Sequence, residues 1–488
     1  MNINLILYIS VSNNIIIYDC LRAHGELSEW LKEHAWKACI RVTVSRVQIP
    51  HSPPLFCKLR QDFAKAESCF LHMKIKDLRR FAMQLRKIGR IGKICAVLGI
   101  AALLMAFNLT AQAKAAASQA YMQYMSAWAS MASYSDKSGL LARQMLNEYG
   151  WHSDFQARRT NDSEAKFLLA QKQIDGKNIY LLAVTGTSSR QDIKTDLKTD
   201  SMVFGGTSPQ QFIQVGRENI DENKPLVHQG FCQYVQDGFF TNEYDGSDRT
   251  LGEFLAAELS SDKNNQLYIT GHSLGGAAAE LLAARLSDMG ADKTQLHVIT
   301  FGAPAVGNQT FVDMYGPKLD LTRITMHGDP VKNLTQIANG KFVQFSADTK
   351  WSLPYSEADK FAHGMLLYFD RAICQYYDQQ PQANIISNVE ISFDFPPELA
   401  DTQKYIEAAL RENQQMLHDD NALKTHIIYK FKAQMLKRDT SNRRYYINAA
   451  KYVYDSKNRL ISGGSASADT KEMTVVQASL YAAYQSGK

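Results

Sequence analysis

Short apolar runs of strand length, separated by polar or alanine-rich stretches, mark the middle of the chain. They fall at residues 165–170, 178–185, 267–270, 296–302, 323–326 and 341–345. The first two runs flank Asp175 and Gly176, a dipeptide that favours a tight hairpin turn. The stretches between 267–270, 296–302 and 323–326 are long enough for helical crossovers. This alternation predicts an α/β fold with a mainly parallel central sheet flanked by helices.

Helical patterns precede and follow this region. Before it, alanine-rich and amphipathic stretches predict helices at 115–131 and 138–149. Beyond about Gln380 the pattern becomes mixed. We expect helices at 401–416, 423–436 and 471–484, a hairpin over 445–461, and a Gly/Ser/Ala-rich linker at 462–468. Residues 380–488 are therefore predicted to be a mixed α+β extension, either a small separate domain or a decoration on the core.

The chain between residues 73 and 113 has the three parts of a secretory signal peptide. A basic stretch precedes a nearly continuous apolar run (94–109), and Ala111-Gln112-Ala113 then places small residues at a cleavage site. The apolar run is shorter than the about 20 residues that a membrane-spanning helix needs. We therefore expect a signal peptide starting at Met73 or Met83, and a secreted or periplasmic protein. A retained N-terminal membrane anchor is the alternative.

Residues 1–72 precede this segment and show no sustained hydrophobic period. The stretch Arg46–Pro50 can be encoded by the T-arm of a tRNA gene, and residues 29–54 resemble translated tRNA genes. We therefore predict that residues 1–72 are an artefact of a wrongly placed start. An additional targeting or regulatory arm is the alternative.

Composition indicates an ordinary globular protein. Of the 488 residues, 45% are hydrophobic and 21% are charged, enough for a large domain and a smaller one. The formal net charge of +5 is small and much of the basic excess lies before residue 94, so we expect no nucleic-acid partner. The cysteines and histidines show no metal-site spacing, so we expect neither a metal nor a cofactor. Cys232 and Cys374 could pair or remain buried free thiols.

The pentapeptide Gly271-His272-Ser273-Leu274-Gly275 lies between an apolar run and an alanine-rich segment. A strand, G-x-S-x-G and a helix in this order are the arrangement of a nucleophile elbow. A serine at such a tight turn has strained dihedral angles, and the glycines at 271 and 275 remove side chains that would collide. We therefore predict that Ser273 is a nucleophile and that His272 has a structural role.

A serine nucleophile needs an orienting acid, and the chain order in α/β-hydrolases is serine, acid, histidine. Asp329 follows the predicted strand 323–326, just past its carboxyl end, where such sheets place catalytic groups. Asp313 and Asp320 are rivals that lie in helix or loop between strands. Asp329 is therefore the predicted acid.

The general base has several histidine candidates. His363 follows the last predicted core strand. His327 is too close in sequence to the predicted acid for both to converge on the serine, and His297 alternates within a strand as a core residue would. His418 and His426 lie in the C-terminal extension. We therefore predict that His363 is the base.

Oxyanion donors are expected beside the serine. The apolar run ending at Val184 leads into Thr185-Gly186-Thr187, where a Gly–Thr step can direct the Thr187 N–H at the site. The N–H of Leu274, which follows the nucleophile, would be the second donor.

Five blocks of sequence, in the family's order, resemble the class 3 (fungal-type) lipases of the α/β-hydrolase superfamily. The blocks are Gly186–Ser188, Val227–Phe231, Gly271–Ala277, Thr300–Asn308 and Asp329–Val331. The resemblance implies a hydrolase domain over 114–379. In it, Ser273, Asp329 and His363 would be nucleophile, acid and base, with Thr187 and Leu274 forming the oxyanion hole.

The chain departs from this family at two places. Thr185 stands where the family usually has an Arg, before the oxyanion glycine. The family's lid falls at 189–197, where Arg190 and other polar residues leave only Ile193 and Leu197 apolar. A lid that opens onto oil should have a wide apolar face. The polar lid favours soluble or short-chain esters, or phospholipid head groups, over bulk triacylglycerol.

The sequence therefore predicts an exported serine hydrolase that cleaves carboxylic esters of lipids through an acyl-enzyme. It needs no cofactor, and its contact with a membrane or lipid surface would be transient. A serine peptidase or thioesterase on the same triad is one alternative. A non-catalytic lipid- or surface-binding module is the other.

Overall fold

The computed structural model describes most of the chain beyond residue 117. The described residues are 118–159, 164–174, 176–186, 200–244, 246, 248–345, 347–357, 360–379, 388–416, 425–437 and 443–487. Ala115–Lys488 forms one compact unit, and Met1–Lys114 is divided from it. The predicted extension 1–72 and signal peptide 73–113 lie outside the described residues. Within the described part, none of the helices combines the length and apolarity needed to cross a bilayer.

A seven-stranded sheet in the order β1-β2-β3-β6-β7-β8-β9 forms the centre of this unit. Its strands are β1 (His152–Arg159), β2 (Glu164–Ile174), β3 (Lys177–Val184), β6 (Gln266–His272), β7 (Leu296–Phe301), β8 (Asp320–Met326) and β9 (Thr349–Trp351). The β2–β3 hairpin turns at Gly176, and the two strands pair antiparallel as predicted. From β3 to β9 all neighbours are parallel, which confirms the α/β fold with a mainly parallel sheet.

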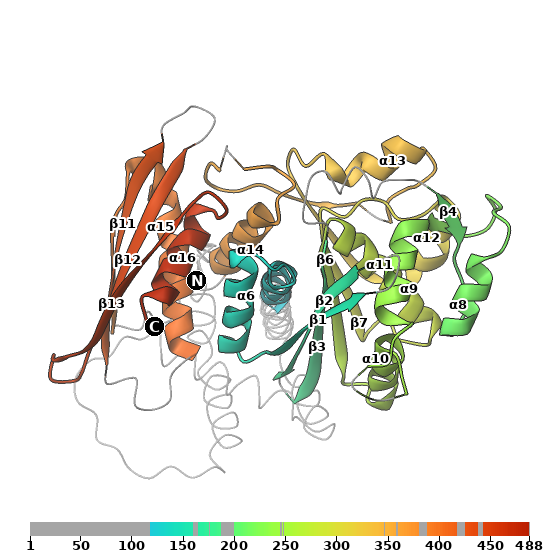
Figure 1. Cartoon of the computed structure of the whole chain (residues 1–488), viewed down its shortest axis with the longest axis horizontal. Coiled ribbons are helices and arrows are strands. Elements are labelled where there is room, and N and C mark those ends of the chain that lie inside the picture. Colours follow the sequence, from blue (N-terminus) through green and yellow to red (C-terminus); the bar gives the residue numbers. More distant parts are fainter. Residues whose placement is uncertain are drawn as a thin grey trace, which may run out of the picture. The chain divides into compact units, whose positions relative to one another are not determined.

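Both faces of this sheet are covered by helices. The helices beside it are 118–132, α6 (Lys137–Glu148), α9 (Gln229–Phe239), α10 (Leu251–Ser261), α11 (Leu274–Asp288) and α14 (Met365–Gln379). In β2, Leu168 and Ala170 join one hydrophobic cluster, while Phe167 and Leu169 join the other. Strands buried on both faces are typical of parallel sheets enclosed by helices. Figure 1 shows α6 and α14 on one side of the sheet and α9, α10 and α11 on the other.

Shorter elements lie at the edge of this core. They are β4 (Ser201–Val203), α8 (Pro209–Gly216), β5 (Leu226–His228), α12 (Gln309–Tyr315) and α13 (Leu334–Asn339). β4 and β5 form a separate antiparallel pair. Cys232 and Cys374 are buried free thiols and do not pair.

The C-terminal extension folds as a four-stranded sheet with two helices. Its elements are β10 (Val389–Asp394), α15 (Ala400–Met416), β11 (His426–Lys437), β12 (Arg444–Tyr454), β13 (Leu460–Asp469) and α16 (Val475–Gln485). The predicted helices at 401–416 and 471–484 and the hairpin over 445–461 are confirmed. Tyr429, Phe431 and Ile447 of this sheet belong to the same hydrophobic cluster as α6 and α14. The extension is therefore packed on the core.

Three predicted elements were wrong. Residues 423–436 were expected to be a helix, but β11 occupies most of this stretch, with Tyr429 and Phe431 buried and Lys430 and Lys432 exposed. This alternation has a period of two, which fits a half-buried strand rather than a helix. The alternation of buried and exposed side chains therefore describes this stretch better than the amphipathic helical pattern does.

The other two errors concern strands. The expected linker 462–468 lies within β13, because backbone hydrogen bonds to β12 do not depend on the small side chains there. The expected strand 341–345 makes only an isolated bridge, between Val343 and Gly307. The sheet is instead completed by the short β9, which pairs with β8.

Candidate active site

Ser273 lies at the tip of a sharp turn between β6 and α11. Its backbone angles are φ 58° and ψ −126°, a positive φ that non-glycine residues rarely adopt. Strain of this kind costs on the order of 1–3 kcal/mol and is found mainly at functional sites. The Ser273 N–H donates to the carbonyl of Phe301 at 3.0 Å, which ties the turn to the end of β7.

The two elbow glycines are needed for close backbone contact. A Cβ on Gly271 would lie 2.3 Å from the carbonyl carbon of Gly275, within the turn itself. A Cβ on Gly275 would lie 2.1 Å from the Val184 carbonyl oxygen at the end of β3. The G-x-S-x-G spacing therefore allows the turn to close and also lets the neighbouring strand end beside it.

Asp329 and His363 come together at the carboxyl ends of the strands. Asp329 follows β8 after Gly328, which has φ 80°, and His363 precedes α14. His363 Nδ1 lies 2.9 Å from Asp329 Oδ2 and 3.0 Å from Oδ1, and both side chains are buried. This contact orients the imidazole through Nδ1, and Nε2 takes no part in it.

The Nε2 atom of His363 is buried and has no hydrogen-bond partner among the described residues, Ser273 included. Where a histidine acts as a general base, its hydrogen bond to the nucleophile often tightens only when substrate binds. The His363 loop is nevertheless linked to the elbow, since His272 Nε2 lies 2.6 Å from the His363 carbonyl oxygen. The two rings have centroids 4.5 Å apart.

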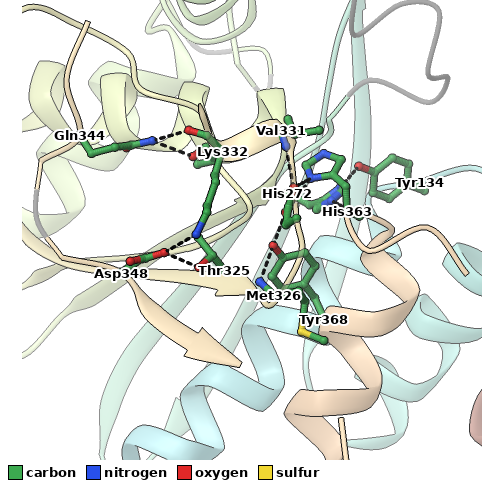
Figure 2. A network of polar contacts seen from close by, with 12 residues as sticks. Tyr134, His272, Thr325, Met326, Val331, Lys332, Gln344, Asp348, His363 and Tyr368 are labelled. Atoms are coloured by element: carbon green, nitrogen blue, oxygen red, sulfur yellow. Dashed lines mark hydrogen bonds and ion pairs between the residues drawn. The ribbon is translucent and has the colours of Figure 1, made fainter. Parts of the chain in front are cut away.

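Tyr368 is a further partner of Asp329, and sequence reasoning missed it. Its hydroxyl donates to Asp329 Oδ2 at 2.5 Å and accepts from the Met326 N–H at 2.9 Å (Figure 2). Val331 N–H donates to Asp329 Oδ1 at 2.8 Å. Burial by itself would raise the pKa of Asp329, but the hydrogen bonds from His363, Tyr368 and Val331 hold it below its ordinary value. The Asp329 carboxylate therefore stays ionised at neutral pH.

Gly302 provides the space in which this cluster fits. It follows β7, has φ 61°, and a Cβ there would lie 2.7 Å from Asp329 Oδ2 and 2.8 Å from the Tyr368 hydroxyl. His363 Nδ1 would be 3.0 Å away. Only glycine combines this backbone angle with this close approach. The glycine was noted in the sequence as part of a block, but its role depends on long-range contacts.

Of the two predicted oxyanion donors, only Leu274 lies among the described residues. Leu274 is the first residue of α11, and the first N–H groups of a helix have no intrahelical acceptor. Thr187 and the lid candidates Arg190, Ile193 and Leu197 lie outside the described residues. Gly186, the residue before Thr187, is described: a Cβ there would lie 2.2 Å from the His272 carbonyl oxygen. The end of β3 therefore touches the elbow.

The rival candidates lie elsewhere. His297 and Asp320 contact each other, with Nδ1 2.5 Å from Oδ2, and Asp320 is the first residue of β8, at the opposite end of the strand from Asp329. Asp313 accepts a hydrogen bond from Gln309 within α12. Neither aspartate contacts His363. Among the described residues, no group of three or more His, Cys, Asp or Glu is arranged to hold a metal ion.

Residues 181–338 match the family described as Lipase (class 3). Lipase ZK262.3 of Caenorhabditis elegans is 35% identical over 109 residues, which are 22% of this chain and 26% of that protein. Toxin TseL of Vibrio cholerae serotype O1 is 32% identical over 101 residues, 21% of this chain and 14% of that protein. The chain thus matches only a minor part of either relative's length.

Among solved structures, similar chains include fungal lipases. A Rhizomucor miehei lipase propeptide complex has a TM-score of 0.36 and 18% identity, covering 48% of this chain and 66% of that chain. Nonglycosylated Yarrowia lipolytica LIP2 lipase has a TM-score of 0.34 and 22% identity, covering 48% and 80%. The matched residues 181–338 include the strand–serine–helix turn and the parallel strands β6, β7 and β8 of the central sheet, so this part of the chain is similar to the class 3 lipases.

Proposed function

We propose that this protein is a serine hydrolase that cleaves carboxylic esters of lipids, with Ser273 as nucleophile, His363 as base and Asp329 as orienting acid. The observation that carries the proposal is the buried 2.9 Å contact between His363 Nδ1 and Asp329, placed beside the strained Ser273 turn. A buried ionised carboxylate that accepts a hydrogen bond from Nδ1 keeps the proton on that nitrogen. Nε2 is then free to take the serine proton.

The proposed reaction has two halves. Ser273 Oγ attacks the ester carbonyl while His363 Nε2 takes its proton, and His363 then gives this proton to the departing alcohol. Water attacks the acyl-serine in the second half, again with His363 as base, and releases the carboxylic acid. We assign oxyanion stabilisation to the N–H groups of Leu274 and Thr187, the first supported by its place at the start of α11.

The substrate class is proposed from the family match and the lid sequence. Class 3 lipase relatives support lipid esters. The polar segment 189–197 favours soluble or short-chain esters, or phospholipids, over bulk triacylglycerol, since it lacks a wide apolar face. The protein would contact a lipid surface only transiently.

A fluorophosphonate probe tests the chemistry directly. The full-length protein should be labelled once, at Ser273, and Ser273→Ala should lose both labelling and hydrolysis of p-nitrophenyl esters by several orders of magnitude. A Ser273→Ala protein with unchanged turnover would refute the proposal. An acyl-chain series on the unlabelled enzyme, with a triacylglycerol emulsion as the last member, should show the highest kcat/KM for soluble esters.

Export and domain boundaries are further proposals. The basic-apolar-small pattern supports a signal peptide over 73–113, followed by the hydrolase domain 114–379 and the extension 380–488. Peptide mass mapping of the protein from its native source should find an N-terminus near residue 114. Peptides from residues 1–72 would contradict the proposed start.

A further inference from the structure

Tyr134 stands at a junction between two parts of the site. It follows the helix 118–132, and its hydroxyl lies 2.8 Å from His272 Nδ1. His272 Nε2 in turn lies 2.6 Å from the carbonyl oxygen of His363. Figure 2 shows Tyr134 beside the His272 and His363 rings, on the side away from Tyr368. The tyrosine is thus connected to the proposed base through one imidazole.

The chemistry of this chain sets the direction of each hydrogen bond. A backbone carbonyl can only accept, so His272 Nε2 must carry the proton and donate to the oxygen of His363. His272 Nδ1 is then an acceptor, and the Tyr134 hydroxyl donates to it. Burial and the neighbouring His363 lower the pKa of His272 to about 3, which keeps its ring neutral at working pH.

The same hydroxyl also meets the end of β3. The backbone of Gly186 also interacts with the Tyr134 hydroxyl, whose oxygen can accept while its proton is donated to His272 Nδ1. A Cβ on Gly186 would lie 2.7 Å from this hydroxyl and 2.2 Å from the His272 carbonyl oxygen. Gly186 is therefore held between Tyr134 and the elbow, and the next residue is Thr187.

The chain around Tyr134 is itself anchored. Arg143 of α6 donates to the Tyr134 carbonyl oxygen at 3.0 Å and also to that of Ala132. The Thr185 hydroxyl donates to the carbonyl oxygen of Ser133 at 3.0 Å. Residues 132–134 thus form a fixed support that contacts the end of β3 directly. Tyr134 extends this support to the elbow.

We propose that Tyr134 and His272 are positioning residues that hold Gly186, at the end of β3, and the His363 loop in register across the Ser273 elbow. The proposal rests on the proposed function, because it assigns these contacts to the alignment of that site. Neither residue transfers a proton to substrate. Small misplacements of reacting groups cost large factors in rate, so loss of the Tyr134 hydroxyl should act on turnover.

The experiment compares Tyr134→Phe with Tyr315→Phe in the full chain, using p-nitrophenyl butyrate. Tyr315 is the matched control because its hydroxyl also makes a hydrogen bond, to Asp288 at 2.6 Å, away from the elbow. Tyr134→Phe should lower kcat by about 10- to 100-fold with KM changed less than about threefold. Its rate of inactivation by a fluorophosphonate should fall in parallel, whereas Tyr315→Phe should keep the wild-type kcat.

A second pair of variants tests the His272 link. In His272→Gln the side-chain amide can still donate to the His363 carbonyl, whereas His272→Leu cannot. We expect His272→Gln to retain about tenfold more turnover than His272→Leu at similar Tm. Equal kcat for the two His272 variants, or wild-type kcat in Tyr134→Phe, would overturn the proposal.

Failure of this inference can be told apart from failure of the proposed function. If Ser273→Ala abolishes activity while Tyr134→Phe is unaffected, only the positioning role fails. If Ser273→Ala stays active, the proposed function itself fails.

Discussion

The carboxylate of Asp329 lies 2.9 Å from Nδ1 of His363, and the two side chains come from loops that follow different strands of one sheet. Asp329→Asn would replace an acceptor with a group that can donate, and would favour the imidazole tautomer with its proton on Nε2. That tautomer cannot accept the serine proton, so kcat should fall by about three to four orders of magnitude. Steady-state hydrolysis of p-nitrophenyl butyrate measures this.

Asp313→Asn is the control for this prediction. Asp313 was a rival acid in the sequence, but its carboxylate contacts Gln309 in α12 rather than His363. We expect its turnover to match the wild type. A comparable loss in both variants would show that the assignment of Asp329 is wrong.

Tyr368→Phe should destabilise the protein in a pH-dependent way. The Tyr368 hydroxyl is one of the donors that hold the pKa of Asp329 below its ordinary value. A group with a lowered folded-state pKa contributes stability above its unfolded pKa, and loses that stability as the pH falls through the folded value. The free energy of unfolding should therefore drop by about 1–2 kcal/mol at pH 7, and by less near pH 3. Urea unfolding at both pH values tests the sign; a larger loss at pH 3 would contradict it.

Gly302→Ala should disturb both stability and the acid–base pair. An added Cβ would lie 2.7 Å from Asp329 Oδ2, at a residue with φ 61°. Gly340→Ala is a matched control, since Gly340 has φ 69° but nothing lies within 4 Å of its Cβ position. The control isolates the backbone strain of about 1–2 kcal/mol. Gly302→Ala should cost about 1–3 kcal/mol more in thermal or urea unfolding, and only this variant should lose turnover.

Asp370 links α14 to the C-terminal helix α16 and should make this contact sensitive to pH. It is fully buried and accepts hydrogen bonds from Thr474 at 2.9 Å, Gln477 at 2.7 Å and Tyr355 at 2.9 Å. Burial, only partly offset by these bonds, raises its pKa to about 7. A raised folded-state pKa means that stability is fully present below the unfolded value near pH 4 and is lost as the pH rises to about 7.

Asp370→Asn removes this titration. Relative to wild type, the variant should therefore gain stability between pH 5 and pH 8, by more than about 1 kcal/mol, since each pKa unit corresponds to about 1.4 kcal/mol. Urea unfolding of both proteins at the two pH values gives the difference. A difference that does not change with pH would count against the buried carboxylate as its source.

Local patterns explain why much of the fold could be predicted. The β2–β3 hairpin was indicated by Asp175 and Gly176, and the elbow by glycines spaced around Ser273, because both depend on backbone geometry within a few residues. The wrong predictions concern elements whose conformation depends on packing against distant parts of the chain. β11 became a strand because one side of it is buried against the core, and β13 because β12 offered a free edge.

The sequence by itself determined the parallel core sheet, the strand–serine–helix turn and the chain order of Ser273, Asp329 and His363. The sheet and the turn follow from short-range spacing, and the chain order is read directly from the positions of the three motifs. Only the tertiary structure decided which aspartate meets His363, that Tyr368 bonds Asp329 in the space left by Gly302, and that Tyr134 reaches His272 from 138 positions away. Hydrogen bonds between residues so distant in sequence have no spacing rule, because their partners are chosen by how strands and helices pack.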